Sequence, residues 1–167
     1  SIIDVATKRI VKTIGPETYF GSFSIDSTSV YYSENGQLKN YTLATGAIRT
    51  VAAQASTPAG APAIDPKGIY VAAGGMNTIT LVRTDNQPNG RVVLTGLCMQ
   101  ANQFVCSVAF SPDGSMLVAG STDGMVTVFD MTKMSTDGVP LKVSSFSTGQ
   151  RVSTVSVTSR TIVANFE

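Results

Sequence analysis

The sequence has 167 residues, enough for one domain with a substantial core, and 43% of them are hydrophobic, as in ordinary globular proteins. Charged residues make up only 14%, the net charge is +1, and the twelve Lys and Arg residues are scattered along the chain. The sequence therefore has no basic cluster for nucleic acid or anionic lipid, and no apolar run approaches the roughly 20 residues that span a membrane. Its start, SIIDVATKRI, lacks both the pattern of a signal peptide and an initiator Met, which favours a processed chain or a fragment.

Short apolar segments separated by turn residues follow one another along the whole chain, a pattern typical of antiparallel β-meanders. Residues 1–5 and 9–14 predict the last two strands of one such unit. The next unit has turn signals at 25–27 and 34–36 between its predicted strands. Further strands are predicted at residues 30–32, 37–41, 47–52, 70–73, 80–82, 91–96, 141–146, 152–157 and 161–165.

The clearest unit spans residues 105–131, with three strands at 105–110, 116–119 and 125–129. Pro112-Asp113-Gly114 and Thr122-Asp123-Gly124 separate them. Proline presets φ, aspartate bonds to the nearby backbone, and glycine accepts a positive φ, so both tripeptides predict tight turns.

This unit is repeated upstream. Ser111 aligns with Asp65 at an offset of 46, and Gly124 aligns with Gly36 at an offset of 88. Units of about 40–46 residues, each a small meander, match the period of propeller blades. The sequence therefore predicts an all-β fold, a β-propeller of four-stranded antiparallel blades. We expect one propeller region, with full blades at about 16–57, 58–104 and 105–150 and half-blades at 1–15 and 151–167.

The half-blades leave two alternatives open. They could join and close a small ring of about four blades, which would remove free strand edges. Alternatively, the chain is part of a larger ring, which the missing initiator Met favours.

The best-preserved unit resembles the WD-repeat (WD40-like) β-propeller family. The matching residues are VAFSPDG at 108–114, LVAGS at 117–121, the Asp123-Gly124 turn, and Phe129-Asp130 in place of the family's Trp-Asp pair. Residues 1–11 are also similar, more weakly, to YVTN-type propellers. The chain has no His and no Trp, so the hydrogen-bonded set of His, Ser or Thr, Asp and Trp that is typical of WD-repeat blades is absent.

Catalytic and metal sites find little support in the sequence. Without His, a Ser-His-Asp or Cys-His arrangement and a His-ligated metal site are excluded. The aspartates recur at turn or strand-end positions of the repeat, which favours a structural role in turns over catalysis. Cys98 and Cys106 are expected to be two small, half-buried residues in a reducing compartment. We therefore expect no enzyme activity, no cofactor and no metal.

The resemblance implies a protein-binding face made by the turns between second and third strands and by the connections between blades. Phe104, apolar in a polar stretch, is a candidate contact anchor or is packed between blades. Asp123, Asn77 and Asn35 are expected to accept backbone N–H bonds within their turns. The candidate residues of this face are Glu34, Asn35, Asn77, Gln103, Phe104, Thr122 and Asp123.

We thus expect a cytoplasmic, non-enzymatic WD-repeat-like scaffold for protein–protein interactions, in a cytoskeletal or other multiprotein complex. Its partners would be other proteins, with no nucleic acid and no membrane span. One alternative is an actin-interacting propeller that assists cofilin-driven filament disassembly. The order of the blades and their sequences loosely resemble those of such propellers. Another is an extracytoplasmic YVTN-type propeller that binds a surface ligand or serves an enzyme as an accessory domain.

Overall fold

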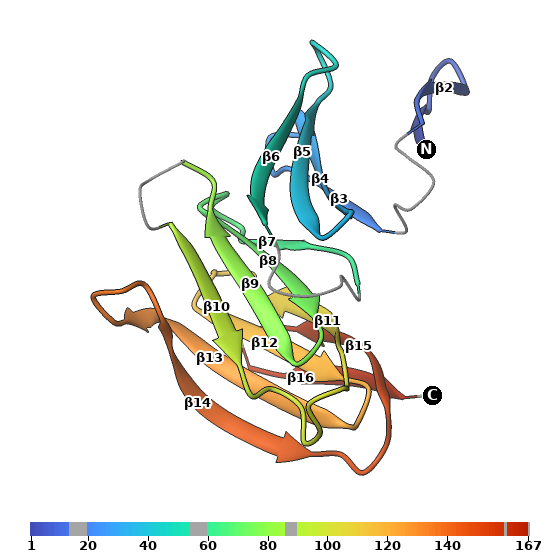
Figure 1. The fold of residues 1–167 in the computed structure, drawn as a ribbon. Coiled ribbons are helices and arrows are strands. Elements are labelled where there is room, and N and C mark those ends of the chain that lie inside the picture. Colours follow the sequence, from blue (N-terminus) through green and yellow to red (C-terminus); the bar gives the residue numbers. More distant parts are fainter. Residues whose placement is uncertain (14–19, 54–59, 86–89, 159, 167) are drawn as a thin grey trace.

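The computed structural model describes residues 1–13, 20–53, 60–85, 90–158 and 160–166. Within these ranges the chain forms β-strands and no helix (Figure 1). Three four-stranded antiparallel sheets lie between two two-stranded sheets. The first three sheets are β1 (Ile2–Asp4) and β2 (Arg9–Lys12); β3 (Gly21–Phe23), β4 (Ser29–Glu34), β5 (Gln37–Thr42) and β6 (Ile48–Ala53); and β7 (Ala63–Ile64), β8 (Tyr70–Gly75), β9 (Thr78–Arg83) and β10 (Arg91–Thr95). The others are β11 (Val105–Phe110), β12 (Met116–Ser121), β13 (Met125–Met134) and β14 (Pro140–Ser147), and finally β15 (Val152–Val157) with β16 (Ile162–Phe166).

Each strand pairs with the next one in the sequence, so every sheet is a simple meander. The first strands of neighbouring sheets contact one another, β3 with β7, β7 with β11 and β11 with β15. This arrangement is that of propeller blades, as the repeat predicted, and the sheets follow one another in an open arc (Figure 1). The two end hairpins remain separate two-stranded sheets, so the described residues do not form the closed four-bladed ring that was one of the two alternatives.

One strand is longer than the sequence indicated. The turn-rich composition of residues 132–140 predicted a connection after a strand ending at residue 129, but β13 continues to Met134. Its ladder with β14 becomes irregular between Asp130 and Met134, and the Asp130 carboxylate accepts hydrogen bonds from both the N–H and the hydroxyl of Thr132. A bulge of this kind accommodates polar residues in a strand, which composition alone does not reveal.

The turn between the first and second strands of each blade is built around a polar side chain. In the β11–β12 turn, the Ser111 hydroxyl donates to Asp113 Oδ1 at 2.6 Å and accepts from the N–H of Met116 at 2.9 Å. Asp113 Oδ1 also accepts from the N–H of Ser115 at 3.0 Å. These bonds, from Ser111 first, lower the pKa of Asp113 to about 2.

The same turn recurs in the two preceding blades with some of its residues exchanged. The Ser24 hydroxyl donates to Asp26 Oδ1 at 2.6 Å in the β3–β4 turn. In the β7–β8 turn, buried Asp65 takes the place of the serine, and its Oδ2 accepts from the N–H groups of Ile69 and Tyr70. The aspartates of these turns therefore act as hydrogen-bond acceptors of the backbone and of hydroxyls, as the sequence pattern indicated.

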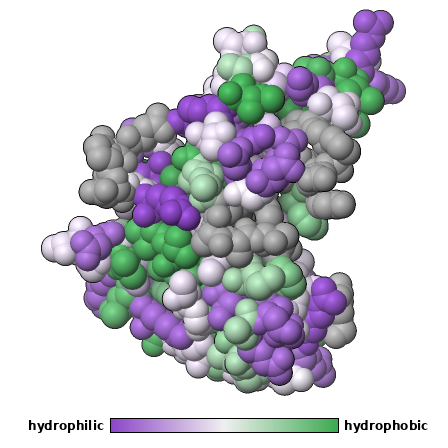
Figure 2. Space-filling model, in the orientation of Figure 1, coloured by the Kyte–Doolittle hydropathy of each residue, from purple (hydrophilic) through white to green (hydrophobic). Residues whose placement is uncertain are grey.

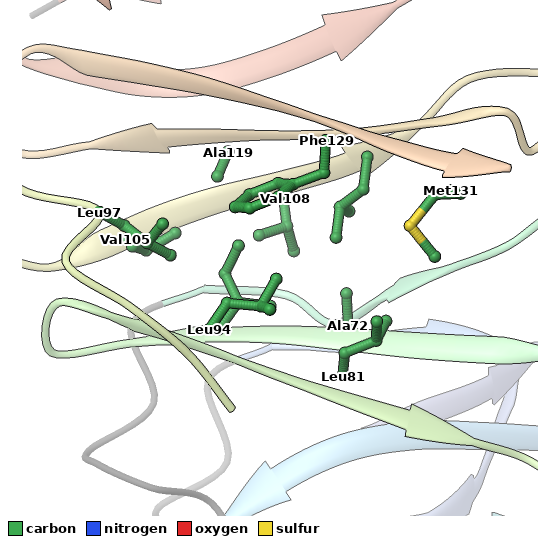
Figure 3. Packing of buried hydrophobic residues seen from close by; sticks show 11 residues of the cluster. Ala72, Leu81, Leu94, Leu97, Val105, Val108, Ala119, Phe129 and Met131 are labelled. Carbon is green, nitrogen blue, oxygen red and sulfur yellow. The ribbon is translucent and has the colours of Figure 1, made fainter. Parts of the chain in front are cut away.

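The core is divided between the interfaces of successive sheets. Figure 3 shows the largest part, where Leu81 and Leu94 of one sheet face Val108, Phe129 and Met131 of the next. Smaller clusters lie between the β3–β6 and β7–β10 sheets and between the β11–β14 and β15–β16 sheets. The fold is thus held together mainly by apolar burial between blades, which is the dominant favourable term in folding.

Glycines at the ends of the second strands bring the blades close together. A Cβ on Gly74 of β8 would lie 2.2 Å from the carbonyl oxygen of Val105 on β11. A Cβ on Gly120 of β12 would lie 2.5 Å from Val152 Cγ1 on β15. Since real side chains never approach so closely, only glycine permits this spacing of the first strands.

Gly74→Val should lower the free energy of unfolding by about 3 kcal/mol, because the added side chain meets a backbone carbonyl of the next blade. Chemical denaturation monitored by circular dichroism measures this loss. Ala53→Val, at an exposed position of β6, is the matched control and should change stability by no more than about 0.5 kcal/mol. Equal effects of the two substitutions would contradict the close-approach argument.

The turn carboxylate of Asp113 should make stability depend on pH in the acid range. Its pKa is about 2 in the folded chain against an ordinary value of 3.8, so its stabilising contribution is complete above about pH 4 and is lost as the pH falls through 2. Asp113→Asn should therefore flatten the fall in melting temperature between pH 4 and pH 2.

Ser111→Ala tests the cause of that shift, because it removes the first of the hydrogen bonds to Asp113. The pKa of the Asp113 carboxyl, measured by NMR titration, should then rise toward the ordinary value of 3.8. An unchanged titration would show that Ser111 does not set this pKa.

Candidate functional site

The connection between β10 and β11, residues 96–104, crosses from one blade to the next. It lies at the same end of the sheets as the β8–β9 and β12–β13 turns, because all three connect the same ends of antiparallel strands. Five of the seven residues predicted for the protein-binding face belong to this connection or to the two turns beside it. These residues are Asn77, Gln103, Phe104, Thr122 and Asp123. We call the connection with its two turns the loop face.

Asn77 forms the first attachment of the connection. Its φ of 50° places it in the left-handed region that Asn tolerates better than most residues. Its Oδ1 accepts hydrogen bonds at 2.7 Å from the N–H groups of Leu97 and Cys98, and its own N–H donates to the carbonyl of Gln103 at 2.8 Å. We expected Asn77 to bond within its own turn, but its side chain instead fixes the connection to the next blade.

Asp123 forms the second attachment, from the following blade. Its Oδ2 accepts a hydrogen bond from the N–H of Gln100 at 3.1 Å, and its Oδ1 accepts one from the Ser121 hydroxyl. Burial raises the pKa of Asp123, but the bonds from Ser121 and from the N–H groups of Gln100 and Met99 outweigh it, and the net shift is downward. The carboxylate is therefore charged at neutral pH and holds the connection from the opposite side.

The end of the connection is joined to Thr122. The Thr122 hydroxyl donates to Gln103 Oε1 at 2.7 Å and accepts from the N–H of Phe104 at 3.0 Å. The Thr122 N–H donates to the carbonyl of Phe104 at 2.9 Å, and Phe104 also forms a β-bridge with Met76. Phe104 is half-buried, with its backbone held between the turns of two blades.

The polar side chains of the loop face are thus engaged in holding the connection, and they leave an apolar residue exposed at its centre. Met99 is 59% exposed, and Gln100, Ala101 and Asn102 after it are exposed too. Met76 on the adjoining turn is 38% exposed. Sequence reasoning missed Met99, because the methionines are scattered and lack a periodic spacing; its place between turn residues in the Leu97–Asn102 run was the available signal.

Glu34 and Asn35, the other two candidates, lie on the β4–β5 turn of a different blade. Glu34 Oε2 forms an ion pair with Lys39 Nζ at 2.6 Å, and Asn35 is exposed with a φ of 50°. These two residues lie at the same end of the sheets as the loop face, on the turn of the preceding blade. The connection after β6, which the low-complexity stretch 53–62 predicted, falls largely outside the described residues.

Chemistry at the thiols is disfavoured by their surroundings. Burial first, and then the negative charge of Asp123, raise the pKa of Cys98 to about 11, so the reactive thiolate is scarce at neutral pH. Cys106 donates its S–H to the carbonyl of Val152 at 2.7 Å, and both residues are half-buried thiols rather than a disulfide.

The described residues hold no group of three or more His, Cys, Asp or Glu side chains that could bind a metal ion. In the same residues, no helix is long and apolar enough to cross a membrane.

A family model identifies one stretch of the chain. Residues 97–130 match the WD domain, G-beta repeat. This stretch begins in the β10–β11 connection and ends on β13, so the matched repeat includes both the connection and the blade that follows it. The resemblance to WD-repeat propellers is therefore confirmed, and it is strongest where the loop face lies.

Solved structures share the fold over nearly the whole chain. With a TM-score of 0.73, the chain resembles U3-55K at 17% identity, covering 93% of this chain and 47% of that one. The RRP9 WD40 repeats give a TM-score of 0.73 at 16% identity, and the match covers 93% of this chain and 47% of the RRP9 chain. Hydrazine synthase of Kuenenia stuttgartiensis gives a TM-score of 0.74 at 16% identity, and the match covers 93% of this chain and 44% of the hydrazine synthase chain.

At these identities the likeness establishes the β-propeller fold and not a shared activity. The chain spans less than half the length of each of the three structures. A search of curated proteins gives no match to the sequence.

Removing the side-chain acceptor of Asn77 should loosen the connection. Asn77→Gly keeps a residue suited to the positive φ but leaves the N–H groups of Leu97 and Cys98 without their acceptor. Hydrogen exchange at these two amides should accelerate about tenfold or more. Asn77→Asp retains the acceptor oxygen and should keep the amides protected; equal exchange in both variants would contradict the role given to Asn77.

Proposed function

We propose that the chain is a non-enzymatic scaffold that binds another protein through the loop face. WD-repeat propellers generally act as protein-interaction scaffolds, and the stretch of this chain that matches a WD repeat includes residues 97–104 of the β10–β11 connection. The observation that carries the proposal is the fixing of residues 97–104 by Asn77, Thr122 and Asp123. A connection held in this way presents its exposed side chains without losing much conformational entropy on binding.

Met99 is the contact anchor in this proposal. An exposed, flexible thioether surrounded by Gln100, Ala101 and Asn102 offers an apolar centre with a polar rim, the usual anatomy of a protein interface. Met76 on the neighbouring turn extends the apolar centre. Phe104, which the sequence suggested either as a contact anchor or as a residue packed between blades, is half-buried, and its backbone is held by the turns of two blades.

The absence of catalysis is part of the proposal. Its support is that the carboxylates of Asp26, Asp65, Asp113 and Asp130 accept hydrogen bonds in turns or bulges, where they stabilise the backbone. A cytoplasmic location is also proposed, supported by Cys98 and Cys106, which are half-buried thiols and not a disulfide. Within this class, a cytoskeletal or other multiprotein complex is the expected setting.

Replacing Met99 by a charged residue should weaken binding at the loop face. A photo-crosslinking amino acid at Asn102, exposed beside Met99, should give a discrete adduct with the protein partner in a cell extract. Met99→Asp should reduce the yield of this adduct about tenfold or more, because it removes an apolar anchor and buries a charge.

Val163→Asp is the matched control for that experiment. Val163 is an apolar residue of comparable exposure, 50% against 59% for Met99, on β16 away from the loop face. Its substitution should leave the adduct unchanged. Equal losses of the adduct in both variants would contradict the proposal.

A further inference from the structure

A second surface lies at the opposite end of the blades from the loop face. A groove of about 660 Å³ separates the β9–β10 end of one blade from the β13–β14 hairpin of the next. The ends of β8 and β9 that line it are those farthest from the β8–β9 turn, so the groove and the loop face open in opposite directions. In Figure 2 the hairpin projects at the left edge of the molecule, with hydrophobic residues directly beside it.

One wall of the groove is fixed by contacts within its blade, and one hydrogen bond joins that wall to the next blade. Arg83 binds Asp85 through two nitrogens, Nη2 at 2.6 Å and Nε at 3.1 Å, and lies over the ring of Tyr70. The Tyr70 hydroxyl donates to Met134 Sδ at 3.3 Å, which links β8 to the far end of β13. Val92, half-buried on β10, adds an apolar side chain to the lining.

The charges of the groove are arranged across it. The guanidinium of Arg83 is balanced by Asp85, so Arg91 supplies the positive charge of the blade wall. Asp137, on the hairpin, supplies a negative charge on the opposite wall, and both residues are exposed. The apolar side chains of Val92 and Met134, lying between opposite charges in a mainly polar groove, complement an apolar side chain that is flanked by an acidic residue on one side and a basic residue on the other.

We propose that this groove binds an extended peptide segment of a partner protein, with an apolar residue on Val92 and Met134, an acidic residue against Arg91 and a basic residue against Asp137. This site goes beyond the loop-face function. It gives the chain a second protein-binding surface on its other end, so that one scaffold contacts two partners at once.

Four labelled five-residue peptides with a central Leu test the proposal by fluorescence polarisation. The residues that flank the Leu are Glu and Lys, two Glu, two Lys, or two Gln. At low salt the Glu-Leu-Lys peptide should bind about tenfold more tightly than the Gln peptide. Its binding should also shift the NMR signals of the Met134 methyl group and of the Gly90 and Gly138 amides, which line the groove.

Charge variants identify the walls. Arg91→Ala should remove the advantage of the acidic residue, and Asp137→Asn should remove that of the basic residue, while Lys67→Ala, an exposed lysine outside this groove, should change neither. Circular dichroism confirms that each variant is folded. Equal affinity for all four peptides, tighter binding of a uniformly charged one, or no signal shift at the groove would overturn the proposal. Met99→Asp lies on the other end, so its outcome tests the loop face separately.

Discussion

The close approach of successive blades is the constraint on which the rest of this structure depends. Gly74 and Gly120 let the first strand of the following blade pass so near that a methyl group would collide with it. At this spacing the apolar faces of neighbouring sheets meet directly, and the three core clusters form between blades rather than within them. A propeller is thus stabilised interface by interface, as expected for repeats that cannot bury their own faces.

The same proximity accounts for the loop face. Because two blades lie side by side, the turn of one blade and the turn of the next both reach the connection between them. Asn77 binds it from one side, and Asp123 and Thr122 bind it from the other. The polar residues that a sequence reader would assign to a partner are therefore used within the chain, and the exposed Met99 is what they present to solvent.

The two ends of the blades differ in physical character. On the loop face, the exposed Met99 is surrounded by amide side chains, and residues 97–104 include no charged residue. The opposite end is a groove with Arg91 and Asp137 on its two walls. If both proposals hold, a surface dominated by apolar contact and one dominated by its charge pattern would select different partners.

The sequence by itself determined the local structure: alternating apolar runs, Asp-Gly turns and the 46-residue repeat predicted the strands, the meanders and the propeller class, because these features depend on neighbouring residues. It also indicated that the aspartates serve turns. Only the tertiary structure decided which residues meet across blades. Asn77 and Cys98 are 21 positions apart, and nothing in the sequence around either residue points to the other. The role of Asn77 and the groove beside Arg91 therefore follow from packing alone.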